Sequence, residues 1–280
     1  MVNPESAHSD KPQPKPAPTK PRNWLFSLLR WFDNEAGEFP HDDGNRRIDW
    51  LRTLPFIALH LAALAVIWVG VSPAAVAVAV GLYLIRMFAI TGFYHRYFSH
   101  KAFRTSRPVQ FLFALVGASS VQRGPLWWAA HHRHHHVHAD GPDDTHSPLQ
   151  QGFLWSHMGW FLCRLNFRTR TELVKDWLTF PELRFLDRYD IVVPALLAFL
   201  LYGLGEALAV LKPHWGTDGP QMLVWGFVIS TVVLYHATFT VNSLAHVWGA
   251  RRYATRDGSR NNAFLAALTL GEGWHNNHHH

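Results

Sequence analysis

Four long apolar segments constrain this chain more than any other feature of its sequence. They cover residues 53–71, 73–94, 191–211 and 222–241. The first and fourth contain no charged side chain, whereas the second contains only Arg86 and the third only Glu206. Stretches of about 20 apolar residues match the hydrocarbon thickness of a bilayer. Four of them in one chain disfavour the buried helices of a soluble protein. They predict an all-α membrane protein with four transmembrane helices.

The composition excludes several classes of protein and separates the N-terminal residues from the main domain. Only 16% of the 280 residues are charged and 48% are hydrophobic, which excludes a wholly disordered protein. The single Cys excludes a disulfide framework and metal clusters held by thiolates. Residues 1–23 are rich in Pro and predict a disordered tail. Residues 24–49 predict an interfacial, pre-membrane segment, either on the lipid surface or packed on the main domain, which would cover residues 50–280.

The distribution of Lys and Arg predicts the orientation in the membrane. Residues 95–190 hold a dozen of these side chains, and residues 248–280 hold four Arg, whereas the loop near 212–221 holds one Lys. The positive-inside rule then places 95–190, 248–280 and both termini in the cytoplasm, where they would form a helical cap. In a bacterium the membrane would be the inner one. Because the basic residues flank the spans, we expect no binding of nucleic acid.

The 20 His residues are the second unusual feature, and most of them gather beside the predicted spans. The sequence HRYFSH follows the second span, HHRHHH begins at His131, NSLAH follows the fourth span, and HNNHHH closes the chain. All these clusters would lie on one side of the membrane, so they can converge. Imidazole is a good ligand for zinc, copper, iron and nickel. Nine clustered His are enough for two metal ions, which predicts a His-rich dimetal site in the cap.

Spacing supports convergence within each cluster. The i, i+3, i+4 or i, i+4 spacing of a shared helix face occurs in His132/His135/His136, His275/His278/His279 and Asn242/His246. His95 and His100 are five residues apart, about 140° on an α-helix. We therefore expect the chain to turn at a helix end there, so that both side chains reach one site.

These clusters resemble the histidine boxes of the integral membrane fatty acid desaturases. HRYFSH resembles the first box, H-x-x-x-x-H, Trp128-Ala129 with HHRHHH resembles the second, and GEGWHNNHH resembles the third. NSLAH (242–246) and SHMGW (156–160) resemble elements of the acyl-CoA, delta-9 branch, which is stearoyl-CoA desaturase-like. The resemblance covers about residues 50–280. Each box alone is weak evidence, but their order and spacing together are specific.

The resemblance implies a ligand set for two iron ions. In the family, nine His and one Asn, through a water, hold the irons. Here these positions are His95, His100, His132, His135, His136, His246, His275, His278 and His279, with Asn242 through water. The register His131, His134 and His135 also fits the second box, but Arg133 directly after His132 favours the first choice. Zinc could replace iron at such imidazoles as an inert substitute.

The resemblance also implies the activity, an O₂-dependent oxidoreductase that inserts a cis double bond into a saturated acyl chain, with acyl-CoA and the delta-9 position expected. An unactivated methylene has no acidic proton and no leaving group, so its oxidation needs a cofactor such as iron with O₂. Two external electrons are required. The chain shows no Cys, flavin or haem motif for them, which implies a separate ferredoxin, rubredoxin or cytochrome b5-like donor with its reductase. The alternatives are a membrane di-iron hydroxylase of a lipid or hydrocarbon and a His-rich metal-binding protein or transporter. The NSLAH element favours the desaturase, and a transporter would need ligands inside the spans.

Further residues are candidates for supporting roles. Carboxylates that could orient ligand His are Asp140, Asp143, Asp144 and Glu272. Candidate substrate contacts are Trp128, Trp155 and Trp160 for an acyl chain, and Arg164 and Arg168 for phosphates of its carrier. The chain departs from the family at Asp144-Thr145-His146, where Asp-Pro-His is usual. It also ends at His280, where the family usually continues, so we expect a truncated C-terminus.

Overall fold

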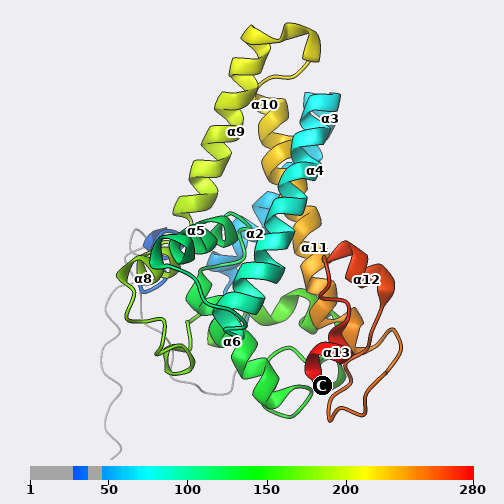
Figure 1. The fold of residues 1–280 in the computed structure, drawn as a ribbon. Coiled ribbons are helices and arrows are strands. Elements are labelled where there is room, and N and C mark those ends of the chain that lie inside the picture. Colours follow the sequence, from blue (N-terminus) through cyan, green and yellow to red (C-terminus); the bar gives the residue numbers. More distant parts are fainter. Residues whose placement is uncertain (1–27, 37–45) are drawn as a thin grey trace, which may run out of the picture.

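The computed structural model describes residues 28–36 and 46–280 of the chain (Figure 1). The predicted tail, 1–23, lies outside the described residues, as do 24–27 and 37–45 of the predicted interfacial segment. The described part of that segment contains a 3-10 turn, η1 (Leu29–Trp31). Phe32, just after it, is 56% exposed.

Four helices are long and apolar enough to cross a membrane, which confirms the prediction from the apolar segments. They cover Trp50–Val69, Pro73–Ser99, Val192–Leu211 and Gly219–His246. The first consists of α2 (Trp50–Ala62), η2 (Ala63–Ala65) and α3 (Val66–Val69). The second joins α4 (Pro73–Phe88) to a π-helix, η3 (Ala89–Ser99). The third is α9 (Val192–Leu211). The fourth joins α10 (Gly219–Met222), the π-helix η9 (Leu223–Ile229), α11 (Ser230–Asn242) and η10 (Leu244–His246).

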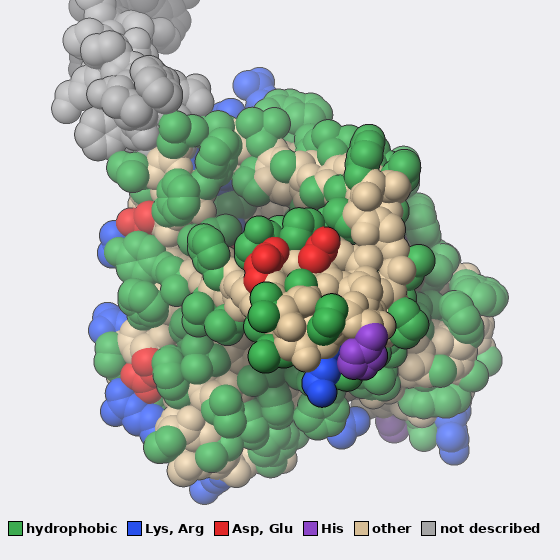
Figure 2. Space-filling model, turned by 90° about the horizontal axis from the view of Figure 1, so that it is seen from above, with side chains coloured by type: hydrophobic (Ala, Val, Ile, Leu, Met, Phe, Trp, Pro, Cys, Tyr) green, Lys and Arg blue, Asp and Glu red, His purple; other side chains and the backbone are tan. Residues whose placement is uncertain are grey.

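The outer surfaces of these helices carry large apolar side chains. Trp68, Phe199 and Val210 are each more than three-quarters exposed. Figure 2 shows that hydrophobic side chains cover most of the surface seen from above, and that charged side chains gather at the rim and in one group near the centre. Such a surface would be unstable in water and matches the hydrocarbon of a bilayer. The exposed apolar area therefore supports an integral membrane protein.

A tight turn joins the first two spans. Gly70 has a positive φ of 69°, which ends α3 without steric cost. Ser72 then accepts the N–H of Ala75 on its Oγ at 3.1 Å, and Pro73 occupies the first position of α4. This N-cap and Pro combination starts the second helix at once. The two spans therefore form a hairpin.

The remaining helices gather at the lower end of the spans in Figure 1 or connect them. They are α5 (Arg107–Ala118), α6 (Pro125–His138), α7 (Pro148–Gln151), α8 (Pro181–Arg188), α12 (Ala263–Leu268) and α13 (His275–His279). Short 3-10 or π turns are η4 (Trp155–Gly159), η5 (Trp160–Leu162), η6 (Arg164–Asn166), η7 (Thr171–Leu173) and η8 (Pro213–Trp215). Within the described ranges the chain forms no β-strand, only isolated bridges.

The main hydrophobic core lies where α6 packs on η3 and α8. It includes the buried side chains of Tyr94, Phe98 and Leu183. Asp187 of α8 accepts the backbone N–H of Trp127 on Oδ1 at 2.7 Å, which satisfies a free donor in the first turn of α6. This contact fixes the start of the helix that carries the HHRHHH sequence.

Arg86 links the second and fourth spans. Its side chain is fully buried, and its guanidinium donates to the hydroxyls of Ser230 and Thr231 and, at 3.3 Å, to the carbonyl of Ser119. Polar contacts of this kind hold helices together in hydrocarbon, where an unpaired donor is costly. Arg86 therefore joins α4, α11 and the end of α5.

Candidate metal centre

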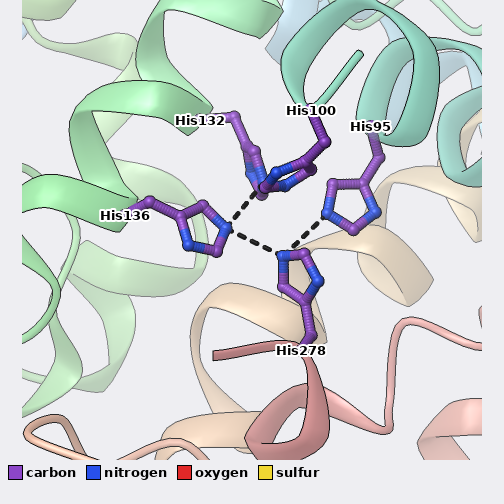
Figure 3. A group of neighbouring side chains, drawn as sticks. All are labelled: His95, His100, His132, His136 and His278. Atoms are coloured by element: carbon purple, nitrogen blue, oxygen red, sulfur yellow. Dashed lines mark hydrogen bonds between the residues drawn. The ribbon is translucent and has the colours of Figure 1, made fainter. Parts of the chain in front are cut away.

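Five His side chains converge on one point between η3, α6 and α13 (Figure 3). They are His95, His100, His132, His136 and His278, hereafter the first group. Each offers a ring nitrogen within 4.8 Å of the others. The Nε2 atoms of His100 and His132 are 2.7 Å apart, and His278 Nε2 lies 2.8 Å from that of His136.

Four more His side chains converge beside the first group. His135, His246, His275 and His279 form this second group, and their ring nitrogens also lie within 4.8 Å of one another. The Nε2 atoms of His246 and His275 are 2.9 Å apart. His279 Nε2 is buried and has no hydrogen-bond partner. An unpartnered buried ring nitrogen among three other imidazoles is the kind of atom that a metal ion would satisfy.

The His side chains of α6 reach both groups, whereas the spacing of His132, His135 and His136 had predicted one shared face. His132 and His136 are four residues apart, share a helix face, and point to the first group. His135 lies on the neighbouring face and points to the second group. The same division occurs in α13, where His278 joins the first group and His275 with His279 the second. Two short helices thus supply six of the nine His.

A π-helix places His95 and His100 on one side, where we had expected a simple turn. The backbone N–H of His100 donates to the carbonyl of His95 at 3.1 Å, an i→i+5 hydrogen bond. The wider turn brings residues five apart much closer in angle than the about 140° of an α-helix. The two ring centroids are 4.8 Å apart as a result.

Two glycines shape the GEGWH sequence before α13. Gly271 has a φ of 122°, a conformation that L side chains rarely adopt. A Cβ on Gly273 would lie 2.0 Å from the backbone N of Ala266, so only Gly fits against α12. This close approach fixes Glu272 and the start of α13, and hence the position of His275.

Four buried or nearly buried carboxylates accept hydrogen bonds from Nδ1 of His in these groups. The pairs are Glu272 with His95 (2.7 Å), Asp140 with His246 (2.8 Å), Asp144 with His135 (3.1 Å) and Asp257 with His279 (2.8 Å). An ionised carboxylate only accepts, so each Nδ1 carries the proton and each Nε2 presents its lone pair. Several lone pairs then point at one another, an arrangement that a cation stabilises. The donor set therefore fits two imidazole-bound metal ions.

The pKa values of the His rings and of Asp144 are shifted toward the protonation states that a metal site needs. Burial lowers the pKa of His136 to about 2, and it lowers the pKa values of His132 and His275 well below the ordinary value, so these rings stay neutral. Burial raises the pKa of Asp144, but the hydrogen bond from His135 and the nearby His146 outweigh it, so the pKa lies below its usual range. A neutral imidazole can bind a metal ion through one ring nitrogen, and an ionised carboxylate can accept the N–H of the other.

The other expected site residues have different positions. Asp143 is exposed; its backbone carbonyl lies 3.0 Å from His134 Nε2, and its carboxylate lies nearest His138, at 3.9 Å. His134 therefore points away from both groups. Asn242 ends α11, and its carbonyl accepts the hydroxyl of Ser156 at 2.8 Å.

An apolar cavity of about 430 Å³ reaches the first group. His132 and Asn242 line it, together with Trp128 and Trp160. The aromatic side chains of α2 and α11 form another part of the wall, and Gln122 donates to Thr238 Oγ1 at 3.0 Å beside them. The cavity can hold an extended apolar group against a ring of the metal centre.

A separate polar cleft of about 960 Å³ contains the remaining candidate substrate contacts. Trp155, Arg164 and Arg168 line it, along with Arg46 and Arg170. The expected substrate residues therefore divide into two sets. Trp128 and Trp160 belong to the apolar cavity, and the other three belong to this polar cleft.

Comparison with known proteins agrees with the resemblance to the fatty acid desaturases. The family described as "Fatty acid desaturase" matches residues 68–280. The chain belongs to the fatty acid desaturase family. It is 38% identical to an sn-1 stearoyl-lipid 9-desaturase of Anabaena variabilis, over 83% of this chain and 82% of that protein. It is also 34% identical to the acyl-CoA 5-desaturase AL21 of Anemone leveillei, over 91% of this chain and 79% of that protein.

Another relative differs in length. The chain is 41% identical to a chloroplastic palmitoyl-monogalactosyldiacylglycerol delta-7 desaturase of Arabidopsis thaliana, over 73% of this chain but 53% of that protein. The chain thus spans about half of that relative and about four-fifths of the other two. These desaturases are named for both lipid-linked and CoA-linked substrates. Family membership therefore supports a fatty acyl desaturase and leaves the carrier to experiment.

Two residues of this candidate site were not among the site residues that the sequence predicted. Asp257 contacts His279, but it stands in a loop with no helical spacing to any His. His146 is buried, its ring lies 4.4 Å from that of His135, and it also lines the apolar cavity. The Asp144-Thr145-His146 sequence was a signal for His146, because it occupies the place of the family's Asp-Pro-His. Asp257 had no such signal.

Proposed function

We propose that this protein is an O₂-dependent fatty acyl desaturase that inserts a cis double bond into a saturated acyl chain. One observation carries the proposal. His132 belongs to the first His group and also lines the apolar cavity, so an apolar chain in the cavity lies against the metal centre. Methylene groups are the substrate that such a cavity selects, because its walls offer them apolar contacts.

We propose two iron ions as the cofactor. The nine His of the two groups would hold them. Asn242, which lines the apolar cavity, would contribute through a water. Iron with O₂ supplies the oxidising power to remove hydrogen from an unactivated methylene, which no side chain provides. Zinc would bind the same imidazoles without redox chemistry. The carboxylates fix the tautomers of four of these His, which orients their Nε2 lone pairs before a metal arrives.

The protein's own part in the reaction is to position the chain and to exclude water. Trp128 stacks on His132 with ring centroids 5.1 Å apart, so it covers one face of this ring, and both side chains line the cavity. Trp160 packs on Trp127 at 5.5 Å and closes another part of the wall. Neighbouring methylenes differ little in chemistry, so the shape of this wall must select the bond that reacts.

The finer assignments are part of the same proposal. We expect an acyl-CoA substrate and a delta-9 product, with carrier phosphates on Arg164 and Arg168 of the polar cleft. We expect the metal-binding end and both termini to face the cytoplasm, because the Lys and Arg side chains concentrate there. A separate ferredoxin, rubredoxin or cytochrome b5-like protein would deliver two electrons per turnover. Its acidic face would fit this basic end.

The test is fatty acid analysis of a host that lacks desaturase activity. We expect a new mono-unsaturated acid with the native protein and with His214→Ala, an exposed His far from the metal centre, and none with His135→Ala. Purified enzyme with iron, O₂ and a reductase system is then given stearoyl-CoA or stearoyl lipid in separate reactions. A hydroxylated product would show a hydroxylase instead, and lipid-only conversion would contradict the acyl-CoA assignment. Absence of any oxidised product would overturn the proposal.

A further inference from the structure

Three His residues form a chain of contacts outside the metal centre. His60 of α2, His236 of α11 and His157 of η4 come from three separate elements. His60 Nε2 lies 3.3 Å from His236 Nε2, and His236 Nδ1 lies 3.0 Å from His157 Nε2. Because His236 uses both ring nitrogens, the three rings form a line and not a pocket for one ion. None of them belongs to a His group of the metal centre.

The ends of this histidine chain (His60, His236 and His157) fix its proton arrangement. His60 Nδ1 lies 2.7 Å from the carbonyl of Phe56, which only accepts, so Nδ1 carries the proton. His236 then donates from Nε2 to His60, and His157 donates from Nε2 to His236. His157 Nδ1 lies 3.0 Å from the hydroxyl of Ser243, which itself donates to the carbonyl of Phe239 at 2.9 Å. One neutral tautomer set therefore satisfies both hydrogen bonds between the rings and the bond to Phe56. Ser243 is thus tied to α2 through three rings.

The histidine chain lies directly behind a wall of the apolar cavity. Phe56, Tyr235 and Phe239 line that cavity. The ring of His60 is 4.3 Å from that of Phe56, and the ring of His157 is 5.6 Å from that of Phe239. The same hydrogen bonds therefore hold together the α2 and α11 surfaces that an acyl chain would contact.

The other end of the histidine chain reaches the segment that faces the metal centre. Ser243 follows Asn242, which lines the cavity as His132 does, and it precedes His246 of the second group by three residues. Ser156, the residue before His157, donates to the carbonyl of Asn242 at 2.8 Å. Ser156 and His157, adjacent residues of η4, thus both contact the end of α11. In hydrocarbon an unsatisfied imidazole is costly, so removing one ring should make its neighbours shift.

We infer that the His60–His236–His157 chain positions the cavity wall relative to the metal centre and thereby determines which carbon–carbon bond is desaturated. The inference rests on the proposed desaturase function. Successive methylenes of a saturated chain differ only in place along the cavity, so a small displacement of the wall presents a neighbouring pair. The three His act through Phe56, Phe239 and Asn242 and do not touch the substrate themselves. They are positioning residues.

The experiment compares His236→Leu, His60→Leu and His157→Leu with native protein and with His214→Leu as the matched control. Double-bond positions in the products are measured by mass spectrometry of dimethyl disulfide adducts, and iron per chain is measured in parallel. We expect the share of product outside the main position to rise roughly tenfold in the variants, with unchanged iron content. His236→Gln, which can still donate and accept, should restore most of the native selectivity.

The outcomes separate this inference from the proposed function. If the variants form product with the native distribution of double bonds, the inference is wrong, whatever the rate of product formation. If all three Leu variants form no product while the native protein does, the chain is needed for folding or reaction and its positioning role is also refuted. If the native protein itself forms no unsaturated product, the proposed desaturase function is wrong, and this result comes from the native sample without any variant.

Discussion

The Nδ1–H of His279 donates a 2.8 Å hydrogen bond to Asp257 Oδ2, and both side chains are almost completely buried. This contact fixes the tautomer of a His in the second group. Carboxylates that hold a ligand His typically contribute 10- to 100-fold to metal affinity. We therefore expect Asp257→Ala to weaken iron binding about 10-fold or more, measured by competition with a chelator.

The matched control for that measurement is Asp143→Ala. The Asp143 side chain is 79% exposed and lies nearest His138, which is in neither group. Its removal should change iron affinity by less than about twofold. Equal losses in the two variants would contradict a specific role for Asp257.

The register of the HHRHHH sequence can be tested with two neighbouring residues. His135 lies in the second group, whereas His134 lies 3.0 Å from the carbonyl of Asp143 and points elsewhere. We expect His135→Ala to lower bound iron by about half or more, because one of the two ions loses a ligand, and His134→Ala to leave it unchanged. Elemental analysis of purified protein measures this. The reverse result would assign the other register.

Asp187 predicts a pH-dependent stability with a definite sign. Burial raises its pKa in the folded protein to about 6, compared with about 3.9 in an unfolded chain. Between these values the folded state binds more protons than the unfolded state. Its contribution to the free energy of unfolding therefore falls as the pH rises through this window, by about 3 kcal/mol in total.

The variant Asp187→Asn removes this titration. An amide oxygen can still accept the N–H of Trp127. We expect the variant to be more stable than native protein above pH 6 and to lack the decline between about pH 4 and pH 6. Denaturant unfolding in detergent across this range checks the prediction. Parallel pH curves for the two proteins would show that Asp187 does not titrate in this way.

Gly273 allows a prediction about packing. A Cβ there would meet the backbone of Ala266 at 2.0 Å, so α12 or α13 must move. We expect Gly273→Ala to destabilise the protein by about 1–3 kcal/mol and to lower iron content, because His275 lies two residues further on. Gly81 has open space around it, so Gly81→Ala should be neutral or slightly stabilising. Thermal unfolding of both variants makes the comparison, and unchanged iron in Gly273→Ala would contradict it.

The sequence was sufficient for features that depend on local pattern. The four spans follow from apolar length. The division of His132 and His135 between two groups was not predicted, because their i, i+3 spacing indicated one shared helix face. The π-helix at His95 and His100 could not be predicted, because two His five residues apart fit a turn at a helix end as well as a π-helix. Contacts between distant segments, such as Asp257 with His279 or His60 with His236, depend on tertiary structure and have no sequence period.

The sharing of α6 and α13 between the two His groups has a further consequence. The ion in the first group would be bound through His132 and His278, which are rigidly joined to His135 and His279 of the second group. Filling one site therefore orders the helices that form the other. Metal uptake should be cooperative, and by linkage each ion should tighten the binding of its neighbour by the same factor. A half-loaded protein would then be a scarce species during any titration.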